Sequence, residues 1–185
     1  MTHTAAFPTA SRARRTGLVV PVPEAEDLVA SWRLEHDPSA ANGAPAHVTL
    51  LFPFRPLEKV ECAIDGLRTF FGSVPRQPFR LVHIGVFPGV VWLAPDPVSV
   101  FIDLTEQLVG SFPDCPPYGG AFRQVVPHLT VIDHSGRDRS AADAREAFVA
   151  RADAALPIDA ELTEVILLAE DDDGRWSTHT TFPLA

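Results

Sequence analysis

His47-Val48-Thr49-Leu50-Leu51-Phe52-Pro53-Phe54 is a short apolar run that carries a histidine and a threonine two residues apart. A second run, His128-Leu129-Thr130-Val131-Ile132, repeats that spacing much later in the chain. β-Branched and aromatic residues favour strands, in which residues i and i+2 project from the same face. Each run is therefore predicted to be a strand that presents an imidazole and a hydroxyl side by side. The apolar residues expected to face the other way, into a core, are Val48, Leu50, Phe52, Leu129 and Val131.

The elements predicted around the two runs follow the same order. The first half is expected to contain a strand, a helix of about a dozen residues opened by Pro23, a loop, the first motif strand, a helix and a strand. The first strand is expected over 16–22, the first helix after residue 23, and the loop over 37–45. After the motif strand, a helix is expected over 57–71 and a strand over 79–87. The second half is expected to begin with a strand over 90–93, a helix from residue 96 and a loop over 112–123. The second motif strand follows, and after it come a helix over 141–155 and strands over 158–169 and 175–182. The motif therefore occupies the same slot in a repeated pattern.

Composition limits the class of protein. A chain of 185 residues fits one domain or two small lobes, and 46% hydrophobic with 21% charged residues is typical of a soluble globular protein. A formal net charge of −9 argues against binding to duplex nucleic acid, which needs a basic surface. A small phosphorylated partner remains compatible with it. No apolar run reaches the ~18 residues of a membrane span, so no membrane association is expected.

Two cysteines, Cys62 and Cys115, match no zinc-ligand spacing and no redox motif. They are interpreted as reduced thiols of a cytoplasmic protein. Residues 1–15 contain three arginines and no acidic residue, and are expected to be a disordered leader. One lysine among the many arginines, with abundant alanine and proline, is typical of a GC-rich bacterial genome.

On the motifs His47-Val48-Thr49-Leu50 and His128-Leu129-Thr130-Val131, the chain resembles the two-histidine phosphoesterase superfamily, and within it the bacterial 2′-5′ RNA ligase family. The 90–93 strand and the closing stretch 174–184 support the likeness, which extends from Gly17 onward. The resemblance implies an α+β fold with two pseudo-symmetric lobes, in which two mainly antiparallel sheets flanked by helices meet in a central cleft. We expect residues 16–185 to form this single domain, as a monomer. The resemblance also implies action on cyclic phosphates or phosphodiesters of RNA ends and nucleotides, with no metal and no cofactor.

The paired motifs suit that chemistry. Cleavage of a phosphodiester needs a base to activate the attacking oxygen and an acid to protonate the departing one, and two imidazoles that titrate near neutrality can share these tasks. His47 and His128 are therefore the predicted catalytic acid and base. Thr49 and Thr130 are predicted to donate hydrogen bonds to the phosphate oxygens, where charge grows.

The basic residue that relatives often carry shortly after a motif is missing here. Positive charge would then come from elsewhere, and the candidates for substrate binding are Arg123, Arg55 and His134. Tyr118 and Phe122, in the loop before the second motif, could stack on a base.

Other histidines and tryptophans receive weaker assignments. His3, His36 and His179 are expected at the solvent-exposed surface, and His83 is a weak candidate for the cleft. Trp92 and Trp176 are expected in the core.

Two further functions stay open. The cleft could capture a nucleotide or RNA terminus with little turnover, which would make the protein a binding module. A metal hydrolase using His47, His128 and Asp133 is the other alternative, although no metal-ligand spacing appears in the sequence.

Overall fold

The computed structural model describes residues 14–122, 124–134 and 142–185. The strands are β1 (Thr16–Pro21), β2 (His47–Leu51), β3 (Gln77–Phe87), β4 (Val90–Asp96), β5 (Leu129–Asp133), β6 (Ile158–Leu162), β7 (Glu164–Glu170) and β8 (Trp176–Pro183). The helices are α1 (Glu26–His36), α2 (Pro38–Ala41), α3 (Glu61–Phe71), α4 (Ser99–Ser111) and α5 (Ala142–Ala152), with 3-10 turns at Pro23–Ala25, Leu57–Lys59 and Pro117–Gly120. The elements predicted from the sequence are present with shifted ends, except that the strand predicted over 158–169 is two strands and α2 lies where a plain loop was expected.

The strands form one antiparallel sheet in the order β6-β3-β4-β5-β2-β1-β7-β8. The two motif strands are neighbours at its centre, joined through the pair Val48 and Leu129. This confirms the α+β class and the antiparallel pairing. The two sheets expected from the sequence are the two halves of a single sheet, because β2 and β5 meet edge to edge.

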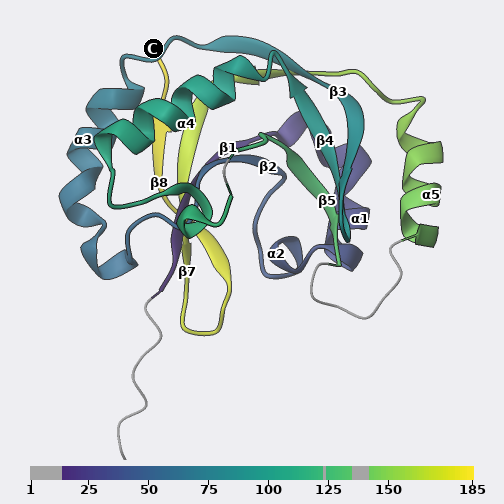
Figure 1. Ribbon diagram of the computed structural model, residues 1–185, viewed down its shortest axis with the longest axis horizontal. Helices are drawn as coiled ribbons and strands as arrows, with labels where there is room; N and C mark the ends of the chain where they lie inside the picture. The colour runs from purple at the N-terminus through teal and green to yellow at the C-terminus, as the bar shows by residue number, and fades with distance from the viewer. Residues whose placement is uncertain (1–13, 123, 135–141) are drawn as a thin grey trace, which may run out of the picture.

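The sheet curls strongly, so that its two halves approach each other at one corner (Figure 1). A single residue, Thr163, separates β6 at one edge from β7 in the other half. The C-terminus closes the corner: Leu184 N donates to Thr163 O at 2.9 Å, and Arg76 N donates to Ala185 O at 3.3 Å. The prediction of one strand over 158–169 was therefore wrong, because the chain turns at a residue with no turn signal in its sequence.

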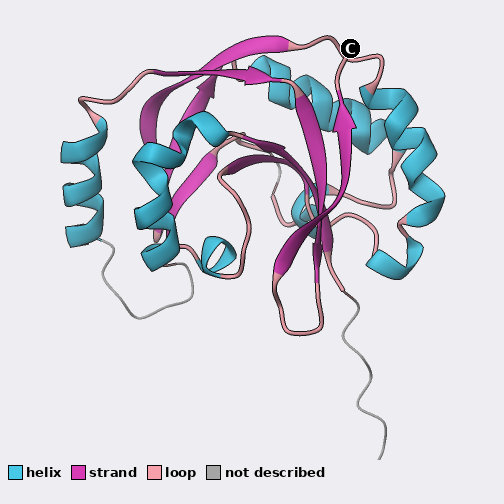
Figure 2. Cartoon of the chain, turned by 180° about the vertical axis from the view of Figure 1, so that it is seen from behind, coloured by secondary structure: helices cyan, strands magenta, loops and turns pink. Residues whose placement is uncertain are grey.

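Helices cover the outer side of the curled sheet in two groups, α1 with α5 and α3 with α4 (Figure 2). Each helix that precedes a motif strand packs on the motif strand of the other repeat: α1 lies against β5, and α4 lies against β2. Residues from both halves, including Leu50, Phe101 and Leu129, belong to one buried core. The two repeats are therefore interlocked through a shared interior.

A β-bulge follows the threonine of each motif. Leu18 pairs with Leu51 but its neighbour Val19 pairs with Thr49, which leaves Leu50 as the extra residue. The same step occurs at Val131, between Thr130 and Ile132. A bulge shifts the in–out alternation by one residue. This is why Leu51 and Ile132 are fully buried and why Phe52, expected in the core, is half-buried at a cavity wall instead.

Most of the expected leader lies outside the described residues, which begin at Arg14. Arg14 and Arg15 are held by the fold: Leu57 N donates to Arg14 O at 3.0 Å, and Glu170 N donates to Arg15 O at 2.9 Å. Of the helices described, none has the length and apolar character needed to cross a bilayer.

Candidate active site

The motif side chains gather on one face of the central strand pair. Because Val48 pairs with Leu129 in antiparallel register, His47 lies across from Thr130 and Thr49 lies across from His128. Directly opposed side chains start ~5 Å apart and diagonal ones roughly 7–8 Å apart. The two histidines therefore occupy opposite corners of a small square, with the two threonines at the other corners. All four are half-buried and line one cavity of about 800 Å³.

Both imidazoles are held in the same way. The Nδ1 atom of His47 lies 2.7 Å from Pro45 O, and the Nδ1 atom of His128 lies 2.6 Å from Val126 O. A carbonyl oxygen can only accept, so Nδ1 carries the proton in each ring. This leaves Nε2 of both neutral rings as the atom able to accept a proton.

The two histidines differ in their electrostatic surroundings. Burial, and after it the charge of Arg33, lowers the pKa of His47 to about 4. Burial also lowers the pKa of His128, where the nearby carboxylate of Asp133 opposes the effect. The proximity of His128 itself lowers the pKa of His47, so the rings titrate as a coupled pair.

Aromatic side chains form the cavity walls. On one side Phe52 and Trp176 meet edge to face, with ring centroids 6.0 Å apart. On the other side Phe87 packs against His128, with centroids 5.2 Å apart. Trp92 lies behind both, 4.9 Å from Phe87 and 5.7 Å from His128 by centroid distance. Flat apolar walls flank the polar square on two sides, which suits a ligand with a phosphate and a ring.

Arg15 brings a guanidinium to the cavity wall. Its Nε and Nη2 atoms each donate to the Glu170 carboxylate at 2.6 Å. The same group lies 5.7 Å from the Phe52 ring centroid and 5.4 Å from that of Trp176. The carboxylate raises the pKa of Arg15. This cluster joins the start of β1, the end of β2 and the β7–β8 turn.

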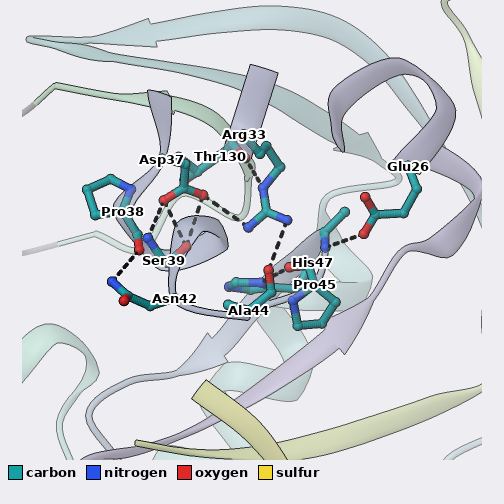
Figure 3. Close-up of polar contacts among 11 residues, drawn as sticks. Glu26, Arg33, Asp37, Pro38, Ser39, Asn42, Ala44, Pro45, His47 and Thr130 are labelled. Atoms are coloured by element: carbon teal, nitrogen blue, oxygen red, sulfur yellow. Dashed lines mark hydrogen bonds and ion pairs between the residues drawn. The ribbon is translucent and has the colours of Figure 1, made fainter. Parts of the chain in front are cut away.

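A second arginine, Arg33, lies behind the motif strands (Figure 3). It is 3% exposed and pairs with the equally buried Asp37 at 3.0 Å. It also donates to Ala44 O and Thr130 O, at 3.3 Å and 3.1 Å. Asp37 in turn accepts from the backbone and hydroxyl of Ser39, and so caps α2.

Of the five predicted substrate-binding residues, two line the histidine cavity, two lie elsewhere, and one is outside the described residues. Tyr118 and Phe122 line the histidine cavity, with ring centroids 5.5 Å apart, and Phe122 is 66% exposed. Arg55 lines a different cavity, where it contacts Cys62 Sγ at 3.2 Å and Asp114 at 3.3 Å. The structure does not bring Arg55 to the histidines. The motif strand β2 ends at Leu51, so Arg55 lies beyond the strand and not on its histidine face.

His134 is buried beside His36 rather than in the cavity wall, with its Nε2 3.3 Å from His36 Nδ1. The expectation that His36 is solvent-exposed was therefore wrong, since its side chain is 12% exposed. His83 and His179 are exposed at the surface. Arg123 and His3 lie outside the described residues.

The metal-hydrolase alternative requires a group of metal ligands, and the described residues do not provide one. Within it, no three His, Cys, Asp or Glu side chains are arranged to hold a metal ion. His47, His128 and Asp133 therefore form no such group, although Asp133 does line the cavity.

Several residues of the site carry no functional signal in the sequence. Trp92 is buried as expected, but Trp176, also expected in the core, is half-buried in the cavity wall. Arg15 was assigned to the leader, and its partner is 155 positions away. Arg33 left one usable signal: it stands four residues before Asp37, a helical ion-pair spacing on an otherwise apolar face.

The sequence profile of the 2′-5′ RNA ligase superfamily matches residues 20–174. The crystal structure of E. coli LigT complexed with 3′-AMP is 20% identical, with a TM-score of 0.62 over 94% of this chain and 99% of that chain. The crystal structure of TT0787 from Thermus thermophilus is 18% identical, with a TM-score of 0.62 over 92% of this chain and 97% of its own. At such identities the solved structures show a shared fold. No curated protein sequence matches the chain.

Proposed function

The chain belongs to the 2′-5′ RNA ligase superfamily, and we propose that it is a metal-independent phosphoesterase that cleaves 2′,3′-cyclic phosphates or 2′-5′ phosphodiesters of RNA ends and nucleotides. One observation carries the proposal. Two imidazoles with Nδ1 held by carbonyl groups line one cavity at opposite corners of a square completed by two threonines. That arrangement presents two proton-transfer atoms to a single phosphate.

The unequal surroundings of the two histidines suggest which one acts as the base and which one as the acid. His47, whose pKa is about 4, is neutral near pH 7 and so starts as the base. Its Nε2 takes the proton of the attacking water as the new P–O bond forms. His128 donates its Nε2 proton to the oxygen that leaves phosphorus. A bound phosphate raises the pKa of His128 by its negative charge, which favours the protonated form in the complex.

Thr49 and Thr130 complete the site as hydrogen-bond donors. Each hydroxyl lies across the strand pair from the imidazole of the other motif. They are therefore placed to donate to the two non-bridging oxygens while the imidazoles act on the entering and leaving oxygens. Such donors stabilise the charge that grows on those oxygens in the transition state.

The cavity walls favour a nucleotide as the substrate class. Phe52 and Trp176 on one side, and Phe87 on the other, offer faces on which a base can stack, and the exposed Phe122 also lines the cavity. Tyr118 is proposed to share in this contact, and Arg123 to supply positive charge to the phosphate. E. coli LigT has been crystallised with 3′-AMP, NADP+ and ATP, which supports a small phosphorylated ligand.

The direct test is turnover of 2′,3′-cyclic, 3′,5′-cyclic and 2′-5′-linked substrates in the presence of EDTA. We expect cleavage of the first or third kind, and a loss of roughly 10²–10⁴-fold in kcat for His47→Ala and for His128→Ala. His179→Ala, at an exposed histidine, is the matched control and should retain full activity. Full activity in either motif variant would refute the assignment.

A binding module with little turnover is the second candidate. It is favoured by the pairing of Arg15 with Glu170, which already occupies the guanidinium at the cavity wall. Calorimetric titration with a 2′,3′-cyclic nucleotide separates the two. Binding without any product formation would select the module.

We also propose that the protein is a cytoplasmic monomer. Cys62 and Cys115 are free thiols, as expected for a reducing compartment. Sedimentation analysis of the purified chain tests the oligomeric state.

A further inference from the structure

In each motif strand, a side chain from the covering helix holds a backbone carbonyl at or next to the bulge. Next to the first bulge, Thr105 of α4 donates its hydroxyl to Leu50 O at 3.0 Å. Next to the second bulge, Arg33 of α1 donates its Nε to Thr130 O at 3.1 Å. Thr105 and Arg33 are each 3% exposed. In one half a neutral hydroxyl holds a carbonyl beside the bulge, and in the other half a charged guanidinium holds the carbonyl one motif position earlier.

Arg33 makes contacts that Thr105 does not. Its Nη1 reaches Ala44 O at 3.3 Å, three residues ahead of His47, while its Nη2 reaches Asp37 at 3.0 Å. Figure 3 shows this guanidinium between the segment that enters β2 and the Thr130 carbonyl of β5. One side chain therefore ties together both histidine-bearing segments.

Holding a carbonyl does not require a buried charge. Removing two ions from water is costly, and the Thr105 hydroxyl shows that an uncharged donor can satisfy the carbonyl beside a bulge. The charged pair at Arg33 and Asp37 therefore calls for an electrostatic reason. The Arg33–Asp37 pair lies near His47, because Asp37 lines the cavity and Arg33 contacts the segment that leads to His47.

We propose that Arg33 and Asp37 form a positioning pair that aligns the two histidine-bearing segments and places a fixed pair of opposite charges beside His47. Its catalytic meaning rests on the proposed function. Its physical content concerns the free protein and can be tested without a substrate.

The charged groups facing each imidazole determine the expected signs. Arg33 and His128 lower the pKa of His47, and Asp37 raises it. Glu26 is also close, since it accepts a hydrogen bond from Ala46 N at 2.8 Å. Facing His128, Asp133 raises the pKa. Removing the Asp37 charge should therefore move His47 titration to lower pH, and removing the Arg33 charge should move it to higher pH.

The experiment follows both histidines by NMR titration in the full chain, using Asp37→Asn, Arg33→Met and Arg33→Lys. Asp37→Asn keeps the shape of the side chain, so it is the variant expected to fold most readily. His47→Gln and His128→Gln identify the resonances. Thr105→Val is the control, because it removes a buried side-chain hydrogen bond to a motif-strand carbonyl, Leu50 O, without changing any charge.

We expect opposite displacements of the His47 midpoint in Asp37→Asn and Arg33→Met, with the His128 midpoint moving less in both. Thr105→Val should leave both midpoints in place while lowering the melting temperature. Arg33→Lys should keep the midpoint near that of the wild type but lower kcat, because an ammonium group cannot reach both carbonyls.

Loosening of the site would admit water to His47 and move its midpoint upward in both variants, because burial is the main cause that lowers the pKa of His47. An unchanged His47 midpoint in Asp37→Asn, or displacements of the same sign in the two charge variants, would overturn the proposal. If Arg33→Met does not fold, the His47 midpoint in Asp37→Asn tests the proposal by itself: a shift to lower pH supports it, and no shift or a shift to higher pH overturns it. A wild-type chain that cleaves no phosphodiester refutes the proposed function but leaves this titration result readable.

Discussion

At the scale of single residues, the site depends on how buried polar groups are held rather than on which groups are present. Histidine and threonine are common on strands, and neither is informative alone. Here each imidazole is oriented by a carbonyl group two residues earlier in the chain, at Pro45 or Val126. The local chain thereby selects the tautomer, and both Nε2 atoms are left for chemistry.

The threonine hydroxyls give the first prediction. Thr49→Val and Thr130→Val keep the shape of the side chain but remove the donor, and should lower kcat by roughly 10–10³-fold because transition-state charge loses a hydrogen bond. Steady-state kinetics on a cyclic nucleotide provides the measurement. Thr49→Ser and Thr130→Ser restore a hydroxyl and should recover most activity. A valine variant as active as its serine counterpart would remove the threonines from the mechanism.

The depressed pKa of His47 predicts an acid-sensitive fold. The unfolded chain takes up a proton at this histidine as pH falls through about 6.5, whereas the folded chain does so only at about 4. The unfolded state therefore binds more protons between these values, and the free energy of unfolding falls with falling pH by up to about 3 kcal/mol from this group.

Urea unfolding at pH 7 and pH 4.5 tests this effect. His47→Gln should narrow the stability difference between the two pH values. Gln107→Ala, an exposed substitution that changes no titrating group, should leave the difference as it is in the wild type. Equal acid sensitivity in all three proteins would contradict the pKa assignment.

At the scale of elements, the bulges shape the site. They re-aim Phe52 toward the cavity and bury Leu51 and Ile132, which strict alternation would leave beside the histidines. The strand β4 then supports the second motif from behind, because Trp92 packs on His128. This packing needs Gly85 on the neighbouring strand.

Gly85 predicts a loss of stability and activity on substitution. A Cβ placed there would lie 2.1 Å from the Trp92 ring, so Gly85→Ala must displace the indole from Phe87 and His128. We expect a cost of about 1–3 kcal/mol in the free energy of unfolding and a lower kcat. Gly66→Ala is the control: it lies in α3 with no atom within 4 Å of the new Cβ. Equal stability of the two variants in thermal denaturation would be evidence against the role of Trp92.

The helices and strands could be predicted from the sequence, but the β-bulges and the break between β6 and β7 could not. Both motif strands, the pairing of each imidazole with a hydroxyl, and the long helices follow from local periodicity. The bulges could not be predicted, because Leu50 and Val131 are apolar residues in apolar runs and an extra one leaves no mark. The break at Thr163 could not be predicted either, because neither glycine nor proline marks it. Arg15 and Trp176 joined the site only through contacts between distant parts of the chain.

At the scale of the whole molecule, charge separates the site from the rest of the surface. The chain carries a formal net charge of −9, while its proposed substrates are anions. The overall field therefore opposes their approach, and the polar square must overcome it locally.

Salt should consequently assist catalysis. Raising ionic strength from roughly 0.01 M to 0.15 M shortens the screening length from ~30 Å to ~8 Å and weakens long-range repulsion. We expect kcat/KM to rise, and to rise more for an oligonucleotide than for a cyclic mononucleotide with fewer charges. A decrease with salt would mean that local positive charge, rather than the net charge of the chain, dominates binding.

The exchange of helices between the repeats, with α1 on β5 and α4 on β2, limits how this chain can be divided. A cut in the exposed Pro88–Gly89 turn would separate each motif strand from the helix that covers it. Neither fragment should fold by itself, yet the two expressed together should complement each other and recover one working molecule.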